Sequence, residues 1–75
     1  MTKQYHISTI IMTKKIRELI NELEKAGFID RGGKGSHRNF IHISGVVLTL
    51  SGNPGDDVKP YQEKLVRLKI KETQE

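Results

Sequence analysis

The apolar residues that follow the second methionine are spaced for one side of an α-helix, and the pattern stops at Gly27. Intervals of three and four residues are typical of an amphipathic helix. The members of this apolar side are Met12, Ile16, Leu19, Ile20, Leu23 and Ala26. A glycine after a helix commonly adopts a left-handed conformation, and the next apolar residue packs back on the last turn. We therefore expect a helix over residues 12–26, with Phe28 returning to contact Leu23.

Three short segments of strand character come next. The predicted strands span residues 28–31, 36–43 and 46–50. A glycine-rich loop (Gly32–Gly35) separates the first two strands, and a turn at Ser44-Gly45 separates the last two. The third segment has the clearest strand character because its two valines are β-branched.

A second helix is predicted over residues 60–71. Pro60 suits its first turn, because the N–H that proline lacks has no partner there. Asp56 and Asp57 lie just before it, near the positive end of the helix dipole. The apolar residues of this helix form two rows; one row is expected to meet the sheet, and the other is left for a partner. The first row is Tyr61, Leu65 and Leu68, and the second is Val66 and Ile70.

The order helix, strand, strand, strand, helix predicts an α+β fold of the α-β-β-β-α type. Its simplest closure is a three-stranded antiparallel sheet with two helices on one face, which leaves the other face open. A chain of 75 residues is expected to form one domain, and we assign residues 12–75 to it. Residues 1–11 are assigned as an N-terminal extension. Because Met1-Thr2-Lys3 recurs as Met12-Thr13-Lys14, translation from Met12 is an open alternative.

The formal net charge of +4 favours a polyanionic partner, which is either a nucleic acid or an acidic protein surface. No stretch approaches the roughly 20 apolar residues that cross a bilayer. The run Ile7–Met12 is too short and too polar for a secretory signal. We therefore expect a cytoplasmic protein without membrane association. Because the chain has no cysteine, it forms neither disulfides nor cysteine-based zinc sites.

His37 is the candidate catalytic residue because its side chain is expected to point to the open side of the sheet. Side chains alternate across a strand. If Phe40 faces the core, His37 faces the open side of the sheet together with Asn39 and Ile41, whereas a bulge near Gly35 would reverse this. An isolated histidine beside a loop is most often only a solvated residue, so that interpretation stays open.

Basic side chains and glycine N–H groups around this histidine can bind phosphate oxygens. The expected supporting RNA-binding residues are Arg31, Lys34, Gly35, Ser36 and Arg38. An imidazole has an unperturbed pKa of about 6.5 and can exchange a proton at neutral pH. RNA carries a 2′-hydroxyl that can attack its own neighbouring phosphate when a base assists. Such cleavage requires neither a metal nor another cofactor, and we expect none.

The remaining polar residues give weaker signals. His6 and His42 are interpreted as having no catalytic role. Asp56 and Asp57 are adjacent, so their side chains tend to diverge, and Asp30 is remote in sequence. No metal site is therefore expected. The chain also has no P-loop, HExxH pair or GxSxG elbow.

Three pieces of sequence follow one another in a specific order. They are LINELEKAGF (19–28), GKGSHRNF (33–40) and LTLSGNPGDDVKPYQEKLV (48–66). With these pieces, residues 16–70 resemble the HicA family of toxin–antitoxin systems. The chain departs from the family pattern at Arg38, where many members have a second histidine, and at His42–Gly45, where a proline-containing turn is usual. Residues 1–11 match nothing in the family.

The resemblance implies a fold like that of double-stranded RNA-binding domains. It also implies an endoribonuclease toxin that cleaves messenger RNA and so inhibits translation, with His37 as general acid or base. The implied partner is a cognate HicB antitoxin that covers the active surface in a hetero-oligomer. Two other interpretations stay open: a non-catalytic RNA-binding module of the same fold, and a protein-interaction subunit whose basic surface meets an acidic partner.

Overall fold

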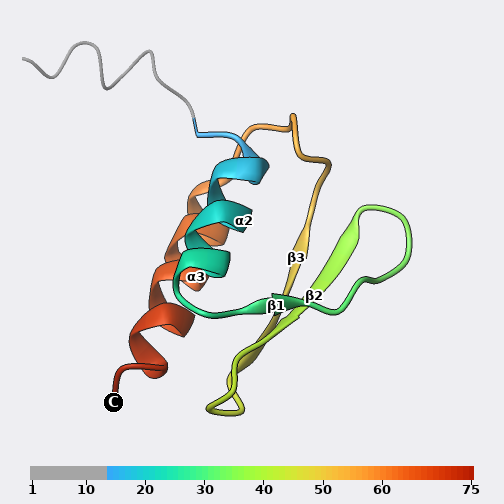
Figure 1. Ribbon diagram of the computed structural model, residues 1–75. Helices are drawn as coiled ribbons and strands as arrows, with labels where there is room; N and C mark the ends of the chain where they lie inside the picture. The colour runs from blue at the N-terminus through green and yellow to red at the C-terminus, as the bar shows by residue number, and fades with distance from the viewer. Residues whose placement is uncertain (1–13) are drawn as a thin grey trace, which may run out of the picture.

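The computed structural model describes residues 14–75 and has the predicted order of elements (Figure 1). The elements are α2 (Ile16–Lys25), β1 (Ile29–Asp30), β2 (His37–Ile41), β3 (Val47–Ser51) and α3 (Pro60–Glu72). The strands form one antiparallel sheet in the order β1-β2-β3, and Figure 1 shows both helices on the same face of it. The predicted α+β class and α-β-β-β-α arrangement are confirmed. The extension assigned to residues 1–11 lies outside the described residues.

The first helix begins at Ile16 and not at the predicted residue 12. The residue before it, Lys15, is extended, and the N–H of Val58 donates to the carbonyl of Lys14 at 2.8 Å. The N–H of Ile16 donates to the carbonyl of Asp56 at 2.9 Å. The loop before α3 therefore supplies acceptors for N–H groups that have no partner within the helix. This long-range contact decides where α2 starts.

Helix α2 ends as predicted, and the first strand is shorter than predicted. Gly27 has a φ of 99°, and the N–H of Phe28 donates to the carbonyl of Leu23 at 2.9 Å. Phe28, predicted to begin the strand, therefore closes the helix. The second strand is also shorter than predicted, because His42 accepts the N–H of Gly45 at 2.8 Å and so belongs to the turn.

The core lies between the helix pair and the inner face of the sheet. Its buried apolar residues are Ile16, Leu19, Leu23, Phe28, Phe40, Leu48, Leu50 and Val66. In α3, Val66 is fully buried and Ile70 packs against the core, whereas Tyr61 and Leu68 are 61% and 55% exposed. The row of Val66 and Ile70 is therefore the one that meets the core, and Leu65 of the other row also packs against it. Within residues 14–75, no helix covers the other face of the sheet (Figure 1), and we call it the open face.

Candidate functional site

The loop between β1 and β2 requires glycine at two positions for different reasons. The carbonyl of Lys34 accepts the N–H of His37 at 3.0 Å, which closes a tight turn. Gly35 has a φ of 59° in this turn, and the left-handed region favours glycine. A Cβ on Gly33 would lie 2.1 Å from the carbonyl oxygen of His37. The loop therefore packs its backbone directly against the first residue of β2.

His37 lies on the open face, as the alternation of the strand predicts. It is exposed at the start of β2, whereas Phe40 in the same strand is buried in the core. A bulge does occur, but in the neighbouring segment: Asn39 accepts the N–H of Arg31 at 2.7 Å, and its own N–H donates to Gly32 at 2.9 Å. Because the extra residue is not in β2, the alternation of that strand is preserved.

The strand register places apolar residues at one end of the open face and polar residues at the other end. At the apolar end, Ile41 lies between Ile29 and Val47. In the middle, the hydroxyl of Thr49 donates to the amide oxygen of Asn39 at 2.7 Å. A shallow hollow of about 300 Å³ covers these two regions; its lining includes Arg31, Asn39, Ile41, Val47 and Thr49. His37 lies beyond this hollow, at the polar end.

Ser51 is the residue directly opposite His37. The N–H of Gly52 donates to the carbonyl of Ser36 at 3.0 Å, so the pair His37 and Ser51 occupies a non-hydrogen-bonded position of the ladder. Side chains are closest at such positions, with Cα atoms about 4.5 Å apart. Ser51 is therefore the residue of β3 whose side chain faces His37 across the strands.

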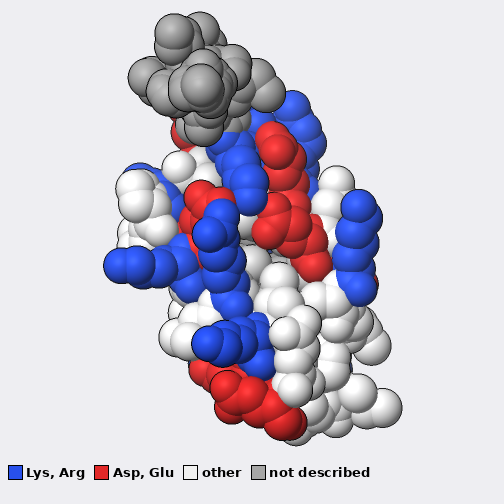
Figure 2. All heavy atoms as spheres, turned by 90° about the vertical axis from the view of Figure 1, so that its left-hand side faces the viewer, with Lys and Arg blue, Asp and Glu red and all other residues white. Residues whose placement is uncertain are grey.

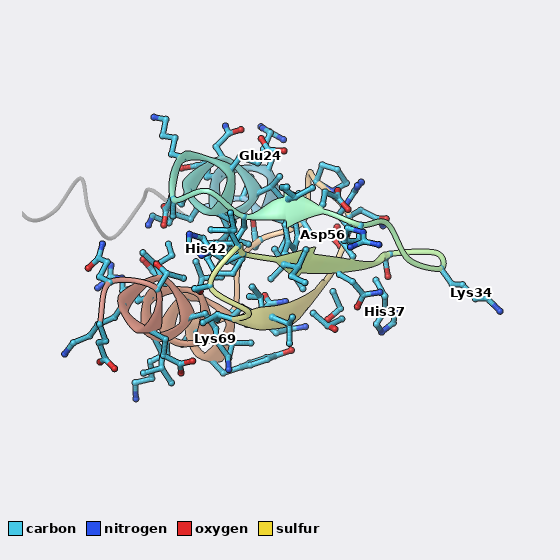
Figure 3. The ribbon with its side chains drawn as sticks, turned by 60° about the horizontal axis from the view of Figure 1, so that its bottom comes forward. Glu24, Lys34, His37, His42, Asp56 and Lys69 are labelled. Carbon is cyan, nitrogen blue, oxygen red and sulfur yellow. The ribbon has the colours of Figure 1, made fainter. Side chains whose placement is uncertain are left out.

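The predicted basic residues do not all lie near the imidazole. Figure 3 shows His37 and Lys34 projecting from the same end of the sheet, away from the helices. Arg31 and Lys34 are both exposed, and within residues 14–75 neither forms an ion pair. Arg38 points to the other side of β2, where its guanidinium lies 3.2 Å from the carboxylate of Asp30. The structure therefore separates Arg38 from His37.

Charges of both signs are mixed on the helix side, and some of them form ion pairs. Figure 2 shows Lys and Arg side chains interspersed with Asp and Glu over this side. The ammonium of Lys14 lies 2.9 Å from the carboxylates of both Glu22 and Glu63, and Glu63 also accepts from Arg67 at 2.8 Å. Hydrogen bonding to Lys14 lowers the pKa of Glu63, and hydrogen bonds to Glu22 and Glu63 raise the pKa of Lys14. Lys34 is the better candidate for phosphate binding at the site because it projects from the same end of the sheet as His37 (Figure 3).

His42 is a structural residue at the opposite end of β2, on the helix side (Figure 3). Its Nε2 lies 3.1 Å from the carbonyl of Ala26, and its Nδ1 lies 3.0 Å from the N–H of Ser44. A neutral ring that carries its hydrogen on Nε2 satisfies both contacts. Its centroid also lies 5.2 Å from that of Phe28. These contacts support the prediction that His42 has no catalytic role.

A comparison with known protein families matches most of the described chain. The family model described as the HicA toxin of bacterial toxin–antitoxin systems matches residues 16–73. The chain belongs to the HicA toxin family. It is therefore a toxin of a toxin–antitoxin pair, and its partner is an antitoxin. The matched region of this HicA toxin encloses all five helices and strands described above. A search of curated proteins finds no match.

Two residues of this HicA toxin were missed by sequence reasoning. The sequence pattern predicts a third strand that ends at residue 50, before Ser51, and indicates no role for Gln62. Ser51 ends β3 opposite His37, and the side chain of Gln62 donates to the carbonyl of Ser51 at 2.8 Å. Extending the strand register outward from the turn at residues 42–46 would have found Ser51. No local signal indicates the contact of Gln62.

The described part of the chain offers neither a metal site nor a membrane-spanning helix. In residues 14–75, no group of three or more His, Cys, Asp or Glu side chains is placed to hold a metal ion. In the same part of the chain, no helix is both long enough and apolar enough to cross a membrane.

Proposed function

We propose that this HicA toxin is an endoribonuclease that cleaves messenger RNA without a metal ion, with His37 as general acid or base. The observation that carries the proposal is one exposed imidazole on the open face, at the end of the sheet from which Lys34 also projects. Arg31 lines the neighbouring hollow, and neither cation forms an ion pair within the described chain. Membership in a family of toxins supports an activity that damages a component of the cell. We also propose that it acts in the cytoplasm, where messenger RNA is translated.

The proposed reaction is an internal transfer at one phosphodiester. The 2′-oxygen of RNA forms a bond to the adjacent phosphorus, and the bond from phosphorus to the 5′-oxygen of the next nucleotide breaks. His37 accepts the proton of the 2′-hydroxyl as a base while water protonates the leaving 5′-oxygen, or it gives a proton to the leaving 5′-oxygen as an acid while water accepts the proton of the 2′-hydroxyl. Lys34 and Arg31 offset the negative charge that develops on the phosphoryl oxygens.

Arg38 has a different role in this proposal. Its guanidinium holds one oxygen of the Asp30 carboxylate, and the other oxygen accepts the N–H of Gly32 at 2.7 Å. Arg38 thus supports the base of the loop that carries Lys34. We assign no phosphate contact to it.

We further propose that the antitoxin is of the HicB type and that it covers the open face. Ile29 and Val47 are 62% and 55% exposed there, and Ile43 at the adjoining turn is 98% exposed. Contiguous exposed apolar residues commonly mark a protein-binding surface. An antitoxin that buries them would also cover the neighbouring His37.

Expression in a bacterial host tests the nuclease proposal. The wild-type chain is expected to arrest growth and degrade messenger RNA, whereas His37→Ala at equal soluble levels leaves both unaffected. His42→Asn is the matched histidine control and should remain toxic if it is folded. Normal growth with soluble wild-type protein would contradict the proposal. Salt-sensitive RNA binding without cleavage would instead indicate a non-catalytic binding module.

A further inference from the structure

Gln62 is a polar side chain buried at the junction of α3 and the sheet. It is 5% exposed. Its Nε2 donates to the carbonyl of Ser51 at 2.8 Å, and its Oε1 accepts the N–H of Lys59 at 2.9 Å. The contact with Lys59 is local to the start of α3, whereas the contact with Ser51 joins that start to the end of β3. A buried amide with both ends bonded can hold these two elements in one relative position.

The carbonyl held by Gln62 belongs to the residue opposite His37. At a non-hydrogen-bonded position, the N–H and C=O of the residue point away from the partner strand. The carbonyl of Ser51 therefore points from β3 toward α3, while its side chain lies on the open face beside His37. This places one residue, Ser51, between the helix contact and the candidate catalytic group.

His37 depends on this support because its own contacts are few. Its N–H donates to Lys34 in the turn at 3.0 Å, and within residues 14–75 no hydrogen bond reaches its ring. The other restraint is the pairing of the segment 36–37 with 51–52, which includes the bond from Gly52 to Ser36. The position of the imidazole therefore depends on the end of β3 as well as on the β1–β2 loop.

We propose that Gln62, acting through Ser51, is a positioning residue for His37. The proposal rests on the proposed nuclease function. When the Nε2 donor is lost, the end of β3 is no longer tied to α3, and the imidazole departs from its place beside the scissile phosphate. A displacement of about 1 Å at a reacting group can lower a rate by about 100-fold. Contacts of the RNA with the loop remain, so substrate binding should change little.

The test compares Gln62→Glu and Gln62→Met with Val66→Ala. Gln62→Glu keeps the acceptor for Lys59 and loses the donor to Ser51, and Gln62→Met loses both. Val66 lies one turn further along α3 and is fully buried, so Val66→Ala weakens the same helix without touching Ser51. With a short RNA and folded protein, kcat should fall about 10-fold to 100-fold in both Gln62 variants at unchanged KM. Val66→Ala should keep the wild-type kcat.

Hydrogen exchange supplies a readout that is independent of cleavage. The Gly52 amide, which bonds to Ser36, should exchange at least tenfold faster in the Gln62 variants than in Val66→Ala. Wild-type kcat and unchanged Gly52 exchange in the Gln62 variants would overturn the proposal, as would an equal fall of kcat in Val66→Ala. If the wild type cleaves and His37→Ala does not, such results refute only the role of Gln62. If the wild type does not cleave, the nuclease function fails, and exchange at Gly52 still decides whether Gln62 holds the strand end.

Discussion

Replacing Gly33 by alanine is expected to impair the site without removing any functional group. The new Cβ would lie 2.1 Å from the carbonyl oxygen of His37, and contacts of this kind below 3.0 Å essentially never occur. The loop and the start of β2 must therefore separate by at least the difference, about 0.9 Å. Because a misplacement of about 1 Å can cost 100-fold in rate, we expect cleavage to fall by about that factor.

Gly32→Ala is the matched control one residue away. A Cβ on Gly32 meets nothing within 4 Å, but its φ of 80° is left-handed, so alanine there should lower the free energy of unfolding by about 1 kcal/mol. Cleavage of a short labelled RNA and urea unfolding are measured for both variants. Gly33→Ala should lose cleavage, whereas Gly32→Ala should lose stability and keep most of its cleavage. Wild-type cleavage by Gly33→Ala, or equal losses in both variants, would refute the reasoning.

Three further predictions concern other parts of the molecule. Because His42 bonds to Ala26 and Ser44, His42→Ala should lower the free energy of unfolding by about 1–3 kcal/mol in urea titrations, with unchanged cleavage per folded molecule. Since Lys14 lowers the pKa of Glu63, this pair stabilises the fold above the unfolded pKa of the carboxyl, and the stabilisation is lost as pH falls through the folded pKa. Glu63→Gln should therefore reduce the loss of folding free energy at acid pH by an amount typical of surface pairs, about 0.2–1 kcal/mol. A plot of melting temperature against pH should then be flatter on its acid side, and an unchanged slope would contradict the role of this pair. Ile43→Asp at a 98% exposed position should weaken antitoxin binding in calorimetry at least tenfold and leave RNA cleavage intact, and unaltered affinity would place the antitoxin elsewhere.

The order of elements could be predicted because it depends on local patterns. The spacing of Ile16, Leu19 and Leu23 defines one helix, and Gly27 with Phe28 marks its end. The orientation of His37 also follows from a local rule, since it needs only the alternation of β2 and a buried Phe40. These features require no knowledge of which distant segments meet.

The remaining features depend on contacts between distant parts of the chain. The start of α2 is set by a bond from Ile16 to Asp56, 40 residues later in the sequence. Arg38 is expected beside His37 because the two are neighbours in sequence. Strand alternation and the ion pair with Asp30 instead place its side chain on the opposite side of β2. Gln62 shows no periodicity or motif that would connect it to Ser51.

The chemistry of the cleaved RNA ends tests the central claim most directly. Purified chain and a defined RNA are incubated in the presence of a metal chelator, and the products are examined by mass spectrometry. Attack by the 2′-hydroxyl with assistance from His37 predicts fragments with a 2′,3′-cyclic phosphate and a 5′-hydroxyl, and no fragments with His37→Ala. Intact RNA with the wild type, fragments with 5′-phosphates, or equal cleavage by His37→Ala would contradict the account.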